Sequence, residues 1–226
     1  DWLGTPGEWM VFQDVDPSTG IISVKRGALD TLPQEWGPGT KLYFCGTDVA
    51  YDETEYIAGE NVLVSALTTT PSGVLELKGS IPIEMKARAI RPYPPANVKI
   101  NNQYYPSEVT GNIVITWVHR NRLQQTGGEI LGWYDGGVTI EPGTSTHLVL
   151  TEYDENQIIL ATNNVNTTGL NSYLFPVLSI QGDTKTIQIT LKTIRDGYEC
   201  LQPYIYFIEI YKPISAPYDL TAEYTG

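Results

Sequence analysis

Cysteine, histidine, positive charge and long hydrophobic stretches are all scarce in this chain of 226 residues. Two cysteines cannot make a disulfide framework, and we expect Cys45 and Cys200 to be free, partly buried thiols, with a bridge between them as the alternative. The two histidines, His119 and His147, have no partner at metal-ligand spacing, so no zinc site is expected. No apolar run approaches the roughly 18 residues of a membrane span, and no N-terminal segment pairs basic residues with an apolar stretch as a signal peptide does.

The charge balance is strongly acidic, with 14 Lys and Arg against 26 Asp and Glu and a formal net charge of −12 at pH 7. Nucleic acid and anionic lipid both require a basic surface, so this charge disfavours both as partners. The sequence also holds no nucleophile-elbow, P-loop or dinucleotide-binding motif. We therefore expect no cofactor, no metal and no catalytic residue in a protein that is not an enzyme.

One acidic string is superficially similar to a calcium-binding loop. Its spacing is Asp14-x-Asp16-x-Ser18, but Thr19 and Lys25 occupy the two positions where an EF-hand requires Gly and Glu. A hairpin turn explains this string better than a metal site.

A second acidic cluster consists of Asp48, Asp52, Glu53 and Glu55. Two carboxylates are all that glycoside hydrolysis requires, so a hydrolytic pair is one interpretation. With 26 carboxylates in the chain, however, such a cluster is expected by chance. A solvated loop is the simpler interpretation.

The chain is rich in the residues of strands and turns. Val, Ile and Thr are frequent, Tyr (15) outnumbers Phe (4), and 21 Gly and 15 Pro supply the turns. No window of helical length shows a 3.6-residue apolar period. The expected strands lie at residues 8–13, 21–25, 41–45, 61–68, 74–77, 81–89, 98–100, 112–119, 147–153, 157–161, around 173–175, at 186–194 and at 204–211.

A proline cluster divides this all-β pattern into two parts. Residues 91–95 (RPYPP) hold three prolines, which neither a helix nor a central strand can include. We predict a small β-barrel or sandwich over residues 1–90. About seven strands in the following segment match an immunoglobulin-like or fibronectin III-like β-sandwich, which we place at 91–213, with Trp117 as its large core aromatic. Residues 214–226 are expected to be a linker and the start of a further, truncated β domain, as in an excerpt from a longer modular chain.

Four strings, in order along the chain, resemble modules of bacteriophage tail proteins. They are residues 20–31 (GIISVKRGALDT), 91–95 (RPYPP), 115–125 (ITWVHRNRLQQ) and 195–199 (RDGYE). In the tail-tip or baseplate hub and central-fibre chains of long-tailed phages, a small β domain precedes a fibronectin III-like domain with such a Trp-x-His-Arg-x-Arg string. The resemblance covers most of residues 9–211 and implies a structural role in the virion, with neighbouring modules forming a ring or trimer. It supplies no catalytic motif.

Two places in the sequence are candidates for contact with a partner or a glycan. Trp133, Tyr134 and Asp135 lie in a Gly-rich loop at 126–143, and exposed aromatics beside carboxylates suit sugar stacking or a protein contact. The alternative is that Trp133 folds back to cover the end of the sandwich. Arg120 and Arg122 could pair with acidic residues of a neighbouring subunit, or could instead satisfy carbonyls at a strand end.

These features together predict a non-enzymatic structural component of a phage tail tip or baseplate hub. Its localisation would be the virion tail, assembled in the host cytoplasm. Its partners would be sister subunits or other tail proteins, and also a host surface receptor or polysaccharide, and the isolated fragment should be monomeric. The first alternative is a carbohydrate- or receptor-binding adhesion module of a bacterial surface protein. A third candidate is a polysaccharide-cleaving tail enzyme.

Overall fold

The computed structural model describes residues 2–5, 7–46, 52–65, 67, 69–74, 76, 79–125 and 129–211, with no side-chain detail for residues 2–5. In these ranges the protein is nearly all β, which confirms the predicted fold class. The helical elements are α1 (Arg122–Gln125) and the 3₁₀ turn η1 (Val177–Ser179). Asp48 and the expected linker at 214–226 lie outside the described residues.

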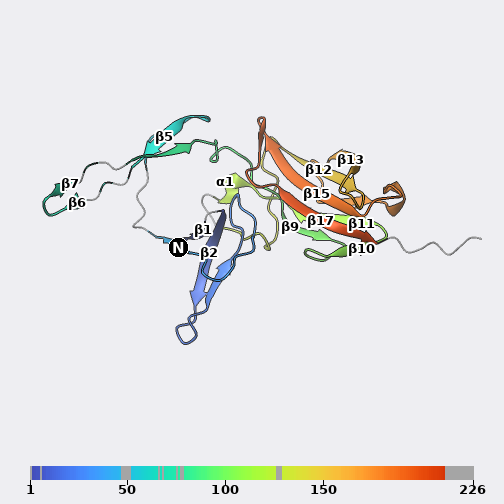
Figure 1. Ribbon diagram of the computed structural model, residues 1–226, viewed down its shortest axis with the longest axis horizontal. Coiled ribbons are helices and arrows are strands. Elements are labelled where there is room, and N and C mark those ends of the chain that lie inside the picture. The colour runs from blue at the N-terminus through green and yellow to red at the C-terminus, as the bar shows by residue number, and fades with distance from the viewer. Residues whose placement is uncertain are drawn as a thin grey trace, which may run out of the picture.

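The C-terminal half is a sandwich of two sheets (Figure 1). The larger sheet has the order β10-β17-β15-β12-β13, with β16 beside β15, and the smaller has the order β14-β11-β9. β10 runs parallel to β17, and the other pairs are antiparallel. Their bounds are β9 (Ala96–Ile100), β10 (Glu108–Thr110), β11 (Ile113–Val118), β12 (Thr144–Tyr153), β13 (Ile159–Asn166), β14 (Ser172–Phe175), β15 (Thr186–Arg195), β16 (Tyr198–Glu199) and β17 (Tyr204–Tyr211). This arrangement is the predicted fibronectin III-like sandwich.

Alternation of apolar and polar residues places the sandwich core. On β15, Ile187, Ile189 and Leu191 are fully buried, while the residues between them face outward. The same period-two burial runs along β11 and β12. Trp117 on β11 is buried in this core, as the sequence predicts.

The N-terminal sheet has four strands in the order β3-β2-β1-β4. They are β1 (Trp2–Thr5), β2 (Glu8–Val15), β3 (Ile22–Lys25) and β4 (Tyr43–Cys45). The loop between β2 and β3 is the predicted hairpin turn, because the Asp16 carboxylate accepts hydrogen bonds from the backbone N–H and hydroxyl of Ser18 and the hydroxyl of Thr19. These bonds hold the pKa of the exposed Asp16 carboxyl down at about 2.

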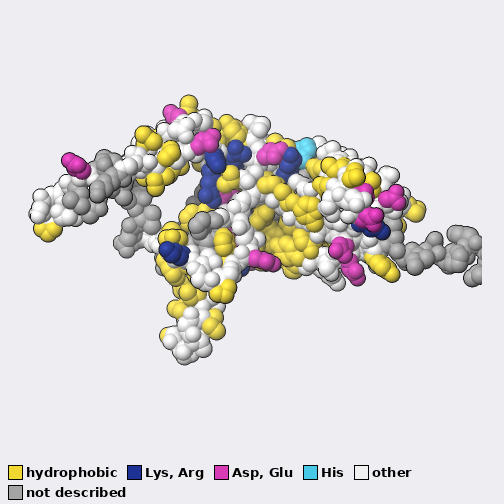
Figure 2. Space-filling model, in the orientation of Figure 1, with side chains coloured by type: hydrophobic (Ala, Val, Ile, Leu, Met, Phe, Trp, Pro, Cys, Tyr) yellow, Lys and Arg dark blue, Asp and Glu magenta, His cyan; other side chains and the backbone are white. Residues whose placement is uncertain are grey.

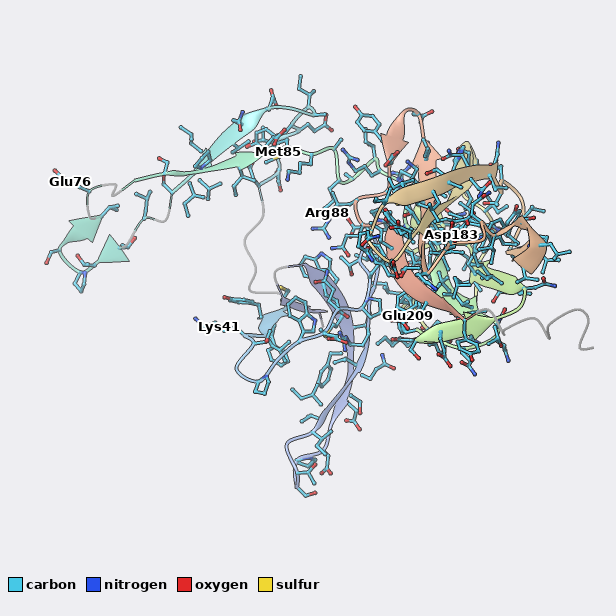
Figure 3. The ribbon with its side chains drawn as sticks, turned by 45° about the vertical axis from the view of Figure 1, so that its right-hand side comes forward. Lys41, Glu76, Met85, Arg88, Asp183 and Glu209 are labelled. Atoms are coloured by element: carbon cyan, nitrogen blue, oxygen red, sulfur yellow. The ribbon has the colours of Figure 1, made fainter. Side chains whose placement is uncertain are left out.

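The described residues between 52 and 85 form an arm that reaches away from both bodies (Figure 1). Its strands are β5 (Asn61–Val64) paired with β8 (Ile81–Glu84), and β6 (Thr69–Thr70) paired with β7 (Gly73–Val74). The expected strands at 61–68, 74–77 and 81–89 are therefore present but shorter. In Figure 3, Met85 and Arg88 lie where the arm joins the rest, and Glu76 lies toward its far end.

The proline cluster adopts no helix or strand at residues 91–95, as predicted. Pro92, Pro94 and Pro95 are nevertheless buried, so this connection is packed against the protein rather than exposed. The described residues before it form two separate parts, the N-terminal sheet and the arm. The domain boundary at residue 90 stays a prediction.

Candidate binding site at the junction of the two halves

The loop that carries Trp133 is held between the N-terminal sheet and the sandwich. The backbone N–H of Trp133 donates to the carbonyl of Arg26 at 2.7 Å, and its carbonyl accepts from the N–H of Asn97 at 2.9 Å. The indole ring is only 1% exposed and belongs to the sandwich core. Trp133 therefore folds back to cover the end of the sandwich, which is the alternative stated from the sequence. Its ring is not available to stack on a sugar.

Tyr134 and Asp135 follow on the surface side of the same loop. Tyr134 is 44% exposed. The Asp135 carboxylate accepts a 2.9 Å hydrogen bond from the backbone N–H of Gly132 and lies 3.3 Å from the ammonium of Lys25. Lys25 also donates to Glu129, and that hydrogen bond raises the pKa of the Lys25 ammonium above its ordinary value. Contact of Tyr134 and Asp135 with a partner stays a prediction.

Arg120 is buried and bonds to backbone carbonyls instead of a carboxylate. Its guanidinium donates to the carbonyl of Gly132 at 2.5 Å and to that of Gly136 at 2.8 Å. Burial lowers its pKa to about 10, which still leaves it charged at neutral pH. These bonds fix the loop that carries Trp133, and they match the interpretation in which this basic string satisfies local carbonyls.

Arg122 is also engaged within the chain. Its guanidinium donates to the Glu141 carboxylate at 3.0 and 3.1 Å, and Arg195 donates to the same carboxylate at 2.8 Å. Glu141 is 1% exposed, so two arginines neutralise one buried carboxylate. Arg122 further donates to the carbonyl of Ala89 at 2.8 Å, which ties the sandwich to the segment leading out of the arm. A contact of Arg120 or Arg122 with another subunit stays a prediction.

Two glycines allow the closest approach between the halves. A Cβ added at Gly132 would lie 2.9 Å from Cβ of Lys25 and 3.1 Å from the carbonyl oxygen of Arg26. A Cβ at Gly27, whose φ is +58°, would lie 2.9 Å from Cβ of Trp133. A larger residue at Gly132 would press against the opposite half, and one at Gly27 would also press against Pro33, 2.5 Å from the added Cβ.

Sequence reasoning missed the buried carboxylate of Glu8. It accepts hydrogen bonds from the Arg26 guanidinium at 2.6 Å twice, from the Trp36 indole N–H at 2.6 Å, and from the backbone N–H groups of Gly27 and Gln34. Its partners lie 18 to 28 residues away in sequence, so no local motif marks them. The bidentate pair between Arg88 and buried Asp30, at 2.5 and 2.6 Å, was missed for the same reason.

The remaining candidates show no assembled chemistry. Asp52 accepts hydrogen bonds from Thr54 and Tyr56 in an exposed loop, and these bonds lower its pKa to about 2. Both cysteines are free, as predicted, and burial raises the pKa of Cys200 to about 11. Among the described residues, no group of three or more His, Cys, Asp or Glu side chains could hold a metal ion. In the same part of the chain, no helix has the length and hydropathy needed to span a membrane.

Comparison with models of known protein families finds no match, and comparison with curated proteins finds no similar sequence. The geometry of the junction therefore has to carry the functional argument together with the four strings noted in the sequence.

Proposed function

We propose that the chain is a non-enzymatic structural component of a phage tail tip or baseplate hub. In this role its β modules act as a stiff building block that contacts sister subunits or other tail proteins. The observation that carries the proposal is the fixed joint between the N-terminal sheet and the sandwich. At Gly27 and Gly132 the two halves approach so closely that an added Cβ would overlap the opposite half, and the backbone N–H of Trp133 donates to the carbonyl of Arg26 across the joint.

Side-chain bonds from Gln202 across the joint support the same role. Gln202 of the sandwich accepts from the backbone N–H of Leu32 at 2.8 Å and donates to the carbonyl of Gly7 at 2.7 Å. Leu32 also packs against the sandwich core. Polar and apolar contacts of this kind restrict the relative motion of the two halves, which suits a stiff building block.

The arm supports a contact with neighbouring chains. Leu63 on β5 is 67% exposed and Ile81 on β8 is 70% exposed, and Figure 2 shows hydrophobic side chains along the arm. A hairpin of two strands is marginal in water on its own, so cover from another chain would stabilise it. Pro82 lacks an N–H and blocks one edge, which leaves β5 as the strand that a neighbour could extend.

The charge of the arm limits the partner that would fit it. Residues 52–85 contain six acidic residues and one basic residue. A surface that carries Lys or Arg beside an apolar strip is therefore the complementary partner.

Antibodies against residues 1–226 test the proposal directly. On phage particles produced from the full reading frame, gold-labelled antibody should mark the tail tip in electron micrographs, and the gene should lie among tail-assembly genes. Label on the bacterial envelope in cells that make no particles would support the adhesion alternative. Hydrolysis of a host polysaccharide that one Asp or Glu substitution abolishes would contradict a non-enzymatic role.

A further inference from the structure

A cleft lies on the surface where the N-terminal sheet meets the sandwich. It has a volume of about 610 Å³, within the range of ordinary small-ligand sites. Arg26, Gln34 and Trp36 line it from the N-terminal part, and Tyr105 and Tyr134 line it from the sandwich. Both halves of the molecule thus contribute to one concave surface.

Tyr105 occupies this cleft in an unusual backbone conformation. Its φ is +49°, in the left-handed region that bulky side chains rarely adopt, and Pro106 follows it directly. The surrounding structure therefore holds the residue against its own preference. Backbone strain of this kind concentrates at binding and catalytic sites.

The Tyr105 ring belongs to an aromatic cluster with Trp133 and Tyr204, and its centre lies 6.3 Å from that of Tyr204. It lies nearly parallel to Trp133, with ring centres 5.9 Å apart and an angle of 16°, and Trp133 lies at the same angle to Tyr204, 6.2 Å away. Trp133 and Tyr204 are buried, whereas Tyr105 is 40% exposed. The cluster is anchored in the core by Trp133 and Tyr204 and presents the Tyr105 ring at the surface.

The opposite wall is fixed by Glu8. This buried carboxylate holds the Arg26 guanidinium and the Trp36 indole N–H, each at 2.6 Å. Tyr134 completes the site and meets Trp133 edge-on, with ring centres 4.9 Å apart. Because both walls are held before any ligand arrives, binding would cost little ordering of side chains.

We propose that this cleft binds a neutral saccharide, with the C–H face of a pyranose ring against Tyr105. The negative face of an aromatic ring attracts such hydrogens, and Gln34 and Arg26 at the rim can hydrogen-bond hydroxyl groups. Glu8 neutralises Arg26, and Glu35 adds a negative charge, so the cleft does not favour phosphates or uronates. Burial raises the pKa of the Tyr105 hydroxyl, which therefore stays protonated at neutral pH.

The proposal does not depend on the structural role proposed above. Trp133 supports the site from below, and of the three loop residues named as glycan candidates only Tyr134 lines the cleft.

The test uses the whole 226-residue chain and four neutral probes that differ in linkage: maltohexaose, isomaltohexaose, cellohexaose and laminarihexaose. Calorimetry should give a Kd of about 10 μM to 1 mM for at least one of them. Amide NMR signals of residues 34–36, 105 and 134 should shift with that probe, while those of β13 should stay in place.

Substitutions then locate the site. Trp36→Ala and Tyr105→Asn should each weaken binding about tenfold or more. Asn tolerates a positive φ, so Tyr105→Asn removes the ring without adding strain. Tyr211 lies at the end of β17 opposite to Tyr204. Tyr211→Ala is therefore the matched control and should leave the affinity unchanged.

Three results would overturn the proposal. The first is that none of the four probes binds at concentrations up to about 10 mM. The second is that a probe binds equally well to both cleft variants. The third is that the amide NMR signals of the cleft shift with a proline-rich peptide but with no sugar. None of these results would contradict the proposed location in the tail tip, because antibody labelling tests that location separately.

Discussion

The sandwich and the N-terminal sheet are both built from strands, yet different forces hold them. Among the described residues, almost every buried apolar side chain belongs to the sandwich, and apart from the buried prolines of residues 91–95 only Met10 and Ala28 precede residue 96. The N-terminal sheet depends instead on Glu8, on the pair between Asp30 and Arg88, and on its contacts with the sandwich. A sheet too small to build its own core can thus be stabilised by buried charge and by a larger neighbour.

The largest expected effect is that of Glu8→Ala. The change leaves the Arg26 guanidinium and several N–H donors without their acceptor, and loss of one partner of a buried pair costs about 3–5 kcal/mol. Hydrogen exchange should show amides of β2 and β3 losing protection while those of β15 keep theirs. Equal loss in both sheets would contradict a separate energetic source for the N-terminal sheet.

Ile189→Ala tests the other side of the comparison. Ile189 is fully buried on β15, and truncation of such a side chain costs about 2–5 kcal/mol. Urea unfolding followed by fluorescence should show this loss for the sandwich. Leu63→Ala in the arm is the control and should change stability by at most about 0.5 kcal/mol; a large effect there would mean that the arm is packed against something.

Gly132→Val tests the joint that connects the two sheets. The added side chain would overlap Lys25 and Arg26, so overpacking should cost about 1–3 kcal/mol and separate the halves. Small-angle X-ray scattering should report a larger radius of gyration. Gly136→Val is the matched control, because a Cβ there meets nothing within 4 Å. Unchanged scattering for Gly132→Val would show that the joint accommodates the added side chain or is not formed.

The smallest expected effect concerns the two thiols. Burial raises the pKa of Cys200 to about 11, whereas an unfolded cysteine titrates near 8.5, so this residue contributes stability below about pH 8.5 that is lost as pH rises toward 11. A thiol reagent at pH 8 should label Cys45 first and Cys200 about 100-fold more slowly. Rapid labelling of both in the native protein would contradict the burial of Cys200.

The sequence was most informative where a strand has one buried face. β15 and β11 could be placed from alternation, because period-two patterning records which face meets the core. The Asn101-Asn102 pair is typical of a turn in sequence, and both residues have positive φ, at 48° and 64°. The short strands β1 and β10 were not predicted, since strands of three or four residues are too short to show a pattern.

The candidate site was less predictable than the fold. Trp133 and Tyr134 were named from composition, but burial separates the two neighbours into a core residue and a surface residue. Trp36 and Tyr105 come from opposite halves of the molecule, and nothing within either segment indicates that they meet. Long-range pairing of this kind becomes visible only once the halves are docked.

The close approach at Gly27 and Gly132 has a consequence for how such a gene can diversify. A recombination crossover between codons 27 and 132 would join backbones that had not been selected together. The fit between them would be kept where both parent genes encode glycine at these two positions. The N-terminal sheet and the sandwich should accordingly be inherited as one block, while sequence exchanged within the arm leaves that fit untouched.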